Sequence, residues 1–163
     1  ITQVQPTYPA DALERHANGR VRLSIVVRRD GRASDIRVVG SPDPALEDAF
    51  DLVTVFEAVH DMSQPVAVLG AARRLLAPGG TLIVMDERVA EQFTAPGDDI
   101  ERFMYGFSLL VCLTNSLAES PSVGTGTAMR PDTLRGYARD AGFAGVAILP
   151  IEHPSFRFYR LDP

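Results

Sequence analysis

Short apolar runs alternate with helical patterns in the second part of the chain. Residues 51–56 (DLVTVF) and 81–87 (TLIVMDE) are continuous apolar runs, and residues 65–77 (PVAVLGAARRLLA) place their apolar positions three to four apart. A continuous run is typical of a strand covered on both faces, whereas the second spacing predicts an amphipathic helix that Pro78-Gly79-Gly80 ends. The order strand, helix, strand predicts a βαβ unit with two parallel strands.

The pattern beyond residue 97 predicts two more helices and two more strands. We expect helices over residues 98–118 and 131–141, the second with Pro131 at its first helical position and Gly142 at its end. Residues 146–151 (VAILPI) and 156–161 (FRFYRL) predict a closing antiparallel pair of strands. The fold class expected is therefore α/β, with helices 65–77 and 131–141 packed on a partly parallel sheet and an antiparallel pair at its margin.

Residues 1–50 have a different pattern. VRLSIVV (21–27) and DIRVV (35–39) flank an Asp30-Gly31 turn signal, which predicts an antiparallel hairpin preceded by a short helix that ends at Gly19. An isolated hairpin is marginal in water, so we expect it to add to the main sheet or to pack beside it. This change in pattern divides the chain into segments 1–49 and 50–163.

Composition narrows the class of protein. The 163 residues are 45% hydrophobic and 23% charged, as in an ordinary globular domain, and all 16 basic residues are Arg. The net charge of −5 argues against nucleic acid as the main partner. No run approaches the ~20 apolar residues of a membrane span, and no signal peptide opens the chain, so we expect a soluble protein without membrane insertion. The single cysteine, Cys112, predicts a buried thiol and argues against a cysteine-based zinc site.

Ionisable residues follow both strands of the predicted βαβ unit. Glu57 and His60 come after the first strand, and Asp86 and Glu87 end the second. Because ligands gather beyond the carboxyl ends of strands in open α/β sheets, we expect these side chains to line one cleft. His60 has an ordinary pKa near ~6.5, which suits a general base, although a hydrogen-bonded structural histidine is an equally common outcome. Glu57 has the alternative of capping the next helix.

The remaining histidines carry no predicted chemistry. His153 precedes Pro154 in a turn, where a solvent-facing side chain is expected. His16, His60 and His153 lack the spacing of metal ligands, so no metal site is predicted.

Residues 51–161 resemble the carboxy-terminal half of a class I S-adenosylmethionine-dependent methyltransferase. The matching pieces are FDLVTVFEAVHDM, ARRLLAPGGTLIVMDE, RPDTLRGYARDAGF and the final two strands, in that order. The resemblance implies a Rossmann-like sheet, S-adenosylmethionine as cofactor, a small-molecule methyl acceptor and a cytoplasmic location, and it is compatible with a homo-oligomer. The implied roles are catalysis by His60, cofactor contact by Asp43, Phe56 and Glu57, and substrate contact by Asp86, Glu87 and Tyr105.

The glycine-rich cofactor loop of that family is missing from residues 1–50. Gly19, Gly31 and Gly40 lie far apart, which argues against cofactor binding and independent activity by this chain alone. Residues 1–49 instead resemble the start of a TonB carboxy-terminal domain, through Tyr8-Pro9, VRLSIVV and DIRVVGS.

A competing alignment makes residues 35–53 the methyltransferase's third strand, its loop and the entry to the fourth strand. Only this alignment gives Asp43 a role at the cofactor. The alternatives to an incomplete methyltransferase are a non-enzymatic, periplasmic TonB-like interaction module and an inactive fusion or truncation fragment.

Overall fold

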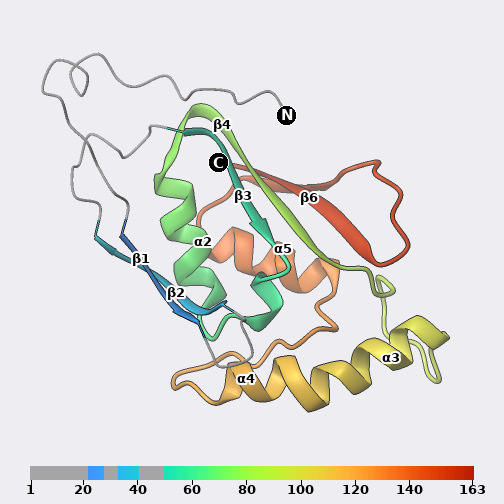
Figure 1. Ribbon diagram of the computed structural model, residues 1–163. Helices are drawn as coiled ribbons and strands as arrows, with labels where there is room; N and C mark the ends of the chain where they lie inside the picture. The colour runs from blue at the N-terminus through green and yellow to red at the C-terminus, as the bar shows by residue number, and fades with distance from the viewer. Residues whose placement is uncertain (1–21, 28–32, 41–49) are drawn as a thin grey trace, which may run out of the picture.

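The computed structural model of the protein describes residues 22–27, 33–40 and 50–163, and its main body is a four-stranded mixed sheet (Figure 1). The strands are β3 (Phe50–Phe56), β4 (Leu76–Glu87), β5 (Gly145–Ile148) and β6 (Phe156–Asp162), in the spatial order β3-β4-β6-β5. β3 and β4 are parallel, and β6 is antiparallel to both of its neighbours. The predicted α/β class, parallel pair and antiparallel margin are thus confirmed.

Two helices cover one face of this sheet. They are α2 (Pro65–Arg74), which connects β3 to β4, and α5 (Pro131–Asp140), which precedes β5. Both begin with proline, whose fixed φ suits the first turn of a helix. The core lies between these helices and the sheet, where Leu69, Leu134, Leu82 and Val84 are completely buried.

The helix after β3 is shorter than its pattern predicts. It ends at Arg74 rather than at residue 77, and Leu76 already belongs to β4. The reason is pairing with β3, because the Phe50 amide donates to the Leu75 carbonyl at 3.0 Å and thereby draws the chain into the sheet. Gly80 allows the two strands to approach, since a Cβ there would lie 2.7 Å from the Phe50 carbonyl oxygen.

β3 is not covered on both faces, contrary to the prediction. Leu52 and Phe56 are 56% and 52% exposed. Val53 and Val55 pack against the core on the helix-covered side. Because side chains alternate along a strand, Leu52 and Phe56 must point to the opposite side. The described part of the chain places both α2 and α5 on one side, and this leaves the other face of β3 open.

The helical stretch predicted for residues 98–118 is present with a break in its hydrogen-bond pattern. It consists of α3 (Asp99–Phe107), a π-helical turn (Ser108–Cys112) and α4 (Leu113–Leu117). Asp98 caps its start by accepting from the Glu101 amide at 2.7 Å. Figure 1 shows this stretch beyond the ends at which β3 and β4 finish, so it faces the predicted cleft.

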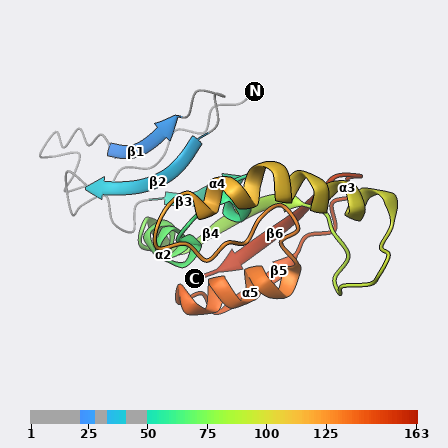
Figure 2. The same cartoon turned by 90° about the horizontal axis from the view of Figure 1, so that it is seen from below.

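The predicted amino-terminal hairpin is present as its own two-stranded sheet. β1 (Arg22–Val27) and β2 (Ala33–Gly40) pair antiparallel to each other, and β2 runs near α2 (Figure 2). The hairpin therefore lies beside α2 and does not extend the main sheet. The predicted helix before Gly19, the Asp30-Gly31 turn and Asp43 lie outside the described residues. Within the described ranges, no helix combines the length and the apolar character that crossing a membrane requires.

Candidate functional site

The loop after β3 turns sharply and carries His60 inward. Phe56 ends the strand, and the Glu57 amide still donates to the Met85 carbonyl of β4 at 2.8 Å. Glu57 itself adopts a left-handed backbone with φ of 48°. This conformation costs a non-glycine residue about 1–2 kcal/mol. The chain then enters the 3₁₀ turn η2 (Val59–Asp61), in which Val59 and His60 are buried.

His60 meets the two acids at the end of β4. Its side chain is 3% exposed, and its Nδ1 forms a short hydrogen bond with Asp86 Oδ1 and lies 2.8 Å from Glu87 Oε2. Asp86 is 1% exposed and accepts the Glu87 amide at 3.1 Å. The parallel pairing of β3 with β4 thus brings His60, Asp86 and Glu87 together, although His60 and Asp86 lie 26 residues apart in the chain.

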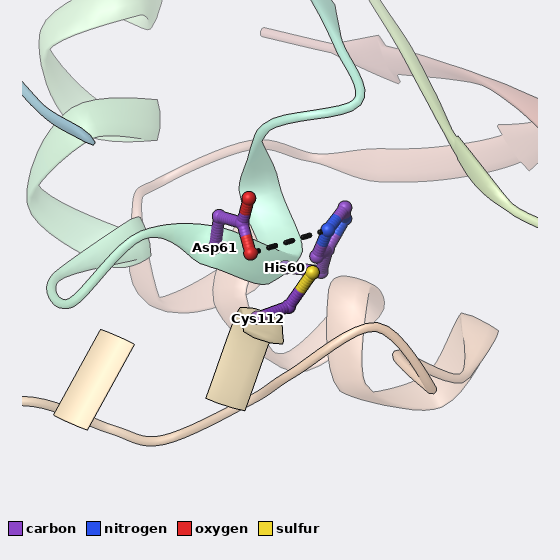
Figure 3. Close-up of side chains that lie close together, drawn as sticks. All are labelled: His60, Asp61 and Cys112. Carbon is purple, nitrogen blue, oxygen red and sulfur yellow. Dashed lines mark ion pairs between the residues drawn. The ribbon is translucent and has the colours of Figure 1, made fainter. Parts of the chain in front are cut away.

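The second nitrogen of His60 faces Asp61, and Cys112 lies beside the same ring. His60 Nε2 lies 3.3 Å from Asp61 Oδ1, and the Cys112 sulfur approaches the ring from the π-helical turn (Figure 3). The predicted burial of Cys112 is confirmed, since the residue is 2% exposed. Among the described residues, Asp61 Oδ1 and Glu87 Oε2 are buried oxygens without a hydrogen bond of good geometry.

The carboxylates around His60 set its charge. Burial by itself lowers the pKa of His60, but hydrogen bonds with Asp86, Cys112 and Glu87 outweigh burial and raise that pKa above its ordinary value. Burial by itself raises the pKa of Asp86, but the hydrogen bond with His60 lowers it, and the net pKa of Asp86 is below its ordinary value. Glu87 has a raised pKa, mainly because burial disfavours its charged form and Asp86 adds to this effect. The arrangement therefore favours an ion pair between His60 and Asp86.

The predicted cofactor residues are not part of the group formed by His60, Asp86 and Glu87. Phe56 and Glu57 are exposed at the tip of β3. The structure does not support Glu57 as a helix cap, because the residues before η2 and α2 are Ala58 and Gln64. Asp43 is outside the described residues.

Tyr105 belongs to a second polar group that sequence reasoning missed. Arg130, at the start of α5, donates to Tyr105 Oη at 2.9 Å, to the Ala90 carbonyl at 2.5 Å and, in a short ion pair, to Glu101 Oε1. Glu101 is 3% exposed, so this is a largely buried ion pair that joins α3 to α5. The signal available was the position of Glu101 three residues before Met104, which places the acid and the apolar side chain on one face of the predicted helix. No contact described in the structure joins Tyr105 to His60.

The expectation of a solvent-facing His153 is wrong. Its Nδ1 accepts the amides of Ser155 and Phe156 at 3.2 and 3.1 Å, and its ring stacks on Phe156 with centroids 4.8 Å apart. His153 is half-buried and organises the turn before β6.

Comparisons with known proteins match both parts of the sequence. The family model described as "Gram-negative bacterial TonB protein C-terminal" matches residues 4–66. This match runs past residue 49 and includes β3, which the structure pairs with β4 rather than with the hairpin. A search of curated proteins found no match to the chain.

Several solved structures with a similar fold are methyltransferases. Human N-acetylserotonin methyltransferase in complex with SAM is 21% identical, with a TM-score of 0.51, over 74% of this chain and 30% of that protein. An O-methyltransferase family protein from Burkholderia thailandensis is 20% identical, with a TM-score of 0.48, over 69% of this chain and 30% of its own. A putative O-methyltransferase from Nostoc punctiforme is 21% identical, with a TM-score of 0.49, over 69% and 31%.

This chain thus spans under a third of the length of the solved structures it matches. In fold, its mixed sheet and helices are similar to a segment of the human methyltransferase.

Proposed function

We propose that this chain is part of an S-adenosylmethionine-dependent methyltransferase that acts on a small molecule. The observation that carries the proposal is the junction of His60 with Asp86 and Glu87, where the parallel strands β3 and β4 both end. In an open α/β sheet this edge is where ligands bind, because the loops and helix starts converge there. The fold similarity to N-acetylserotonin methyltransferase supports the same conclusion.

The residues present fit one side of the cofactor. Phe56 offers an exposed aromatic face and Glu57 an exposed carboxylate, next to each other at the tip of β3. These groups suit the adenine ring and the ribose hydroxyls of an adenosine. When bound, S-adenosylmethionine supplies an electrophilic methyl group. The glycine-rich loop that would hold the rest of the cofactor is absent from residues 1–50, so a second chain or a longer form of this one would complete the pocket.

His60 is the proposed general base in its neutral form, so binding of cofactor or acceptor must first release the Nε2 proton that the surrounding carboxylates hold in the free chain. Asp86 and Glu87 occupy Nδ1, so Nε2 is the nitrogen at which a proton from an acceptor hydroxyl or amine is taken up. Asp86 acts as a positioning residue, because its bond to Nδ1 fixes the ring and stabilises the imidazolium that forms. Glu87 and Tyr105 are the proposed walls of the acceptor site.

Calorimetric titration with S-adenosylhomocysteine tests the proposal. Because only one side of the cofactor pocket is present, we expect weak but saturable binding, and Phe56→Ala should weaken it about tenfold further, the loss typical of a removed base-stacking aromatic. Phe103→Ala is the matched control, because Phe103 is 64% exposed on α3 and should leave the affinity unchanged. Folded protein that gives no saturable heat at millimolar ligand would refute cofactor binding by this chain.

A second candidate is a binding module of the TonB type, in the periplasm. The match of residues 4–66 to the TonB family model favours it, and so does the separate hairpin β1–β2, because a partner strand can add to the edge of a two-stranded sheet. Backbone amide exchange distinguishes the two candidates. Protection of residues 22–27 or 33–40 by an extended peptide supports the module, and S-adenosylhomocysteine would then have no effect on residues 56–60.

A further inference from the structure

We propose that His60, Asp61 and Cys112 form a binding site for a divalent transition-metal ion such as zinc. The three residues offer one nitrogen, one oxygen and one sulfur atom, and these atoms all lie within 4.8 Å of one another. Figure 3 shows the Cys112 sulfur and the Asp61 carboxylate turned toward the same imidazole. No spacing rule predicts this site, because Cys112 lies some fifty residues after the other two in the chain.

The imidazole is oriented as it is in metal sites. A histidine that binds a metal through one nitrogen usually donates its other N–H to a carboxylate, which fixes the ring. His60 has this arrangement, since Nδ1 is bonded to Asp86, which is 1% exposed, and Nε2 lies 3.3 Å from Asp61 Oδ1, with the Cys112 sulfur beside the same ring. Asp86 would thus support the metal site without being a ligand.

The distance between Nε2 and Asp61 Oδ1 fits one cation between them. A tetrahedral zinc ion with bonds of about 2.0–2.2 Å to nitrogen and oxygen separates two such ligands by about 3.3–3.5 Å. The observed separation is 3.3 Å. Asp61 Oδ1 is also a buried oxygen whose contact with Nε2 lacks hydrogen-bond geometry, so a cation between the two atoms would give this oxygen a well-placed partner.

Cys112 decides which cations fit. Its thiolate is a soft ligand, and a set of imidazole, thiolate and carboxylate favours zinc or cobalt over magnesium or calcium. The residue closes the π-helical turn, a feature frequent at functional sites, and this turn places its sulfur against His60. The Asp61 side chain is 20% exposed, so it lies at the solvent side of an otherwise buried site.

Metal binding and base catalysis exclude each other at this site. Both use the Nε2 lone pair, so zinc would inhibit the methyl transfer proposed above. The metal site does not depend on that function, because it can be measured without cofactor or acceptor.

Titration of the chelator-treated full chain with Co²⁺, followed by absorbance, tests the site. We expect one Co²⁺ per chain, a thiolate-to-cobalt charge-transfer band, and loss of the band when zinc is added. Cys112→Ser should abolish the band. Asp86→Asn should weaken the affinity 10–100-fold, as is usual for a residue that orients a ligand.

Two further variants keep the result decisive. Asp61→Asn changes a partly exposed residue, should fold normally by circular dichroism and should weaken Co²⁺ binding at least tenfold. His153→Gln removes a histidine outside the site and should leave the spectrum unchanged. Absence of the band in wild-type protein, or a band that survives Cys112→Ser, would overturn the proposal. Failure of S-adenosylhomocysteine to bind would leave it intact.

Discussion

The ion pair between Glu101 and Arg130 allows a quantitative test of what holds α3 against α5. Glu101 is 3% exposed and Arg130 is 15% exposed. Removing one partner of a fully buried pair costs about 3–5 kcal/mol, because the other charge stays buried without compensation. Arg130 retains the Ala90 carbonyl, Tyr105 Oη and some solvent contact, so we expect Glu101→Ala to lower the free energy of unfolding by about 2–3 kcal/mol.

Urea denaturation followed by circular dichroism measures this loss. With a slope of about 2 kcal/mol per molar urea, the midpoint should fall by about 1–1.5 M. Glu152→Ala is the matched control, because Glu152 pairs with Arg88 while 88% exposed and should cost no more than about 1 kcal/mol. Replacing Glu101 and Arg130 together by methionine should cost less than Glu101→Ala alone. Equal losses for Glu101→Ala and Glu152→Ala would refute the reasoning.

Three further changes test the core and the site by the same denaturation assay. Gly126→Ala should destabilise the fold by at least ~2 kcal/mol, because Gly126 has a φ of 74° and its added Cβ would clash with the Ser108 hydroxyl oxygen. Gly106→Ala in α3 is the control: its added Cβ meets nothing within 4 Å, so it should stabilise the fold by up to about 1 kcal/mol. Similar effects of the two changes would refute the clash. Leu69→Ala should cost about 2–5 kcal/mol, since the side chain is completely buried, and a loss below 1 kcal/mol would contradict the assigned core. His60, which faces Asp61, Asp86, Glu87 and Cys112, has a raised pKa, so its charged form stabilises the metal-free fold fully below pH ~6.5 and progressively less as the pH rises. The free energy of unfolding of the wild type should therefore fall above that pH relative to His60→Gln. Parallel pH profiles of the two proteins would refute this role.

Local chemistry in the sequence was enough to predict most of the elements. The apolar runs 51–56 and 81–87, with a helical pattern between them, predicted the parallel pair β3 and β4, because a short crossover helix permits little else. Pro131 likewise predicted the start of α5, and the two β-branched runs before residue 40 predicted the antiparallel hairpin strands. The predicted ends of elements were less accurate where strand pairing decided them. Leu76, for example, pairs with Phe50 of β3 and so belongs to β4 rather than to the helix before it.

The sequence by itself also determined which residues reach the strand ends, since position after a parallel strand is a local property. Only the tertiary structure decided what they do there. The inward turn of His60 depends on the left-handed Glu57, and the approach of Cys112 depends on a π-helical turn that no spacing reveals. Contacts between segments far apart in the chain then shift the pKa values of His60 and Asp86 against the effect of burial, whereas burial raises the pKa of Glu87. Both the contacts and the burial exist only once the sheet has formed.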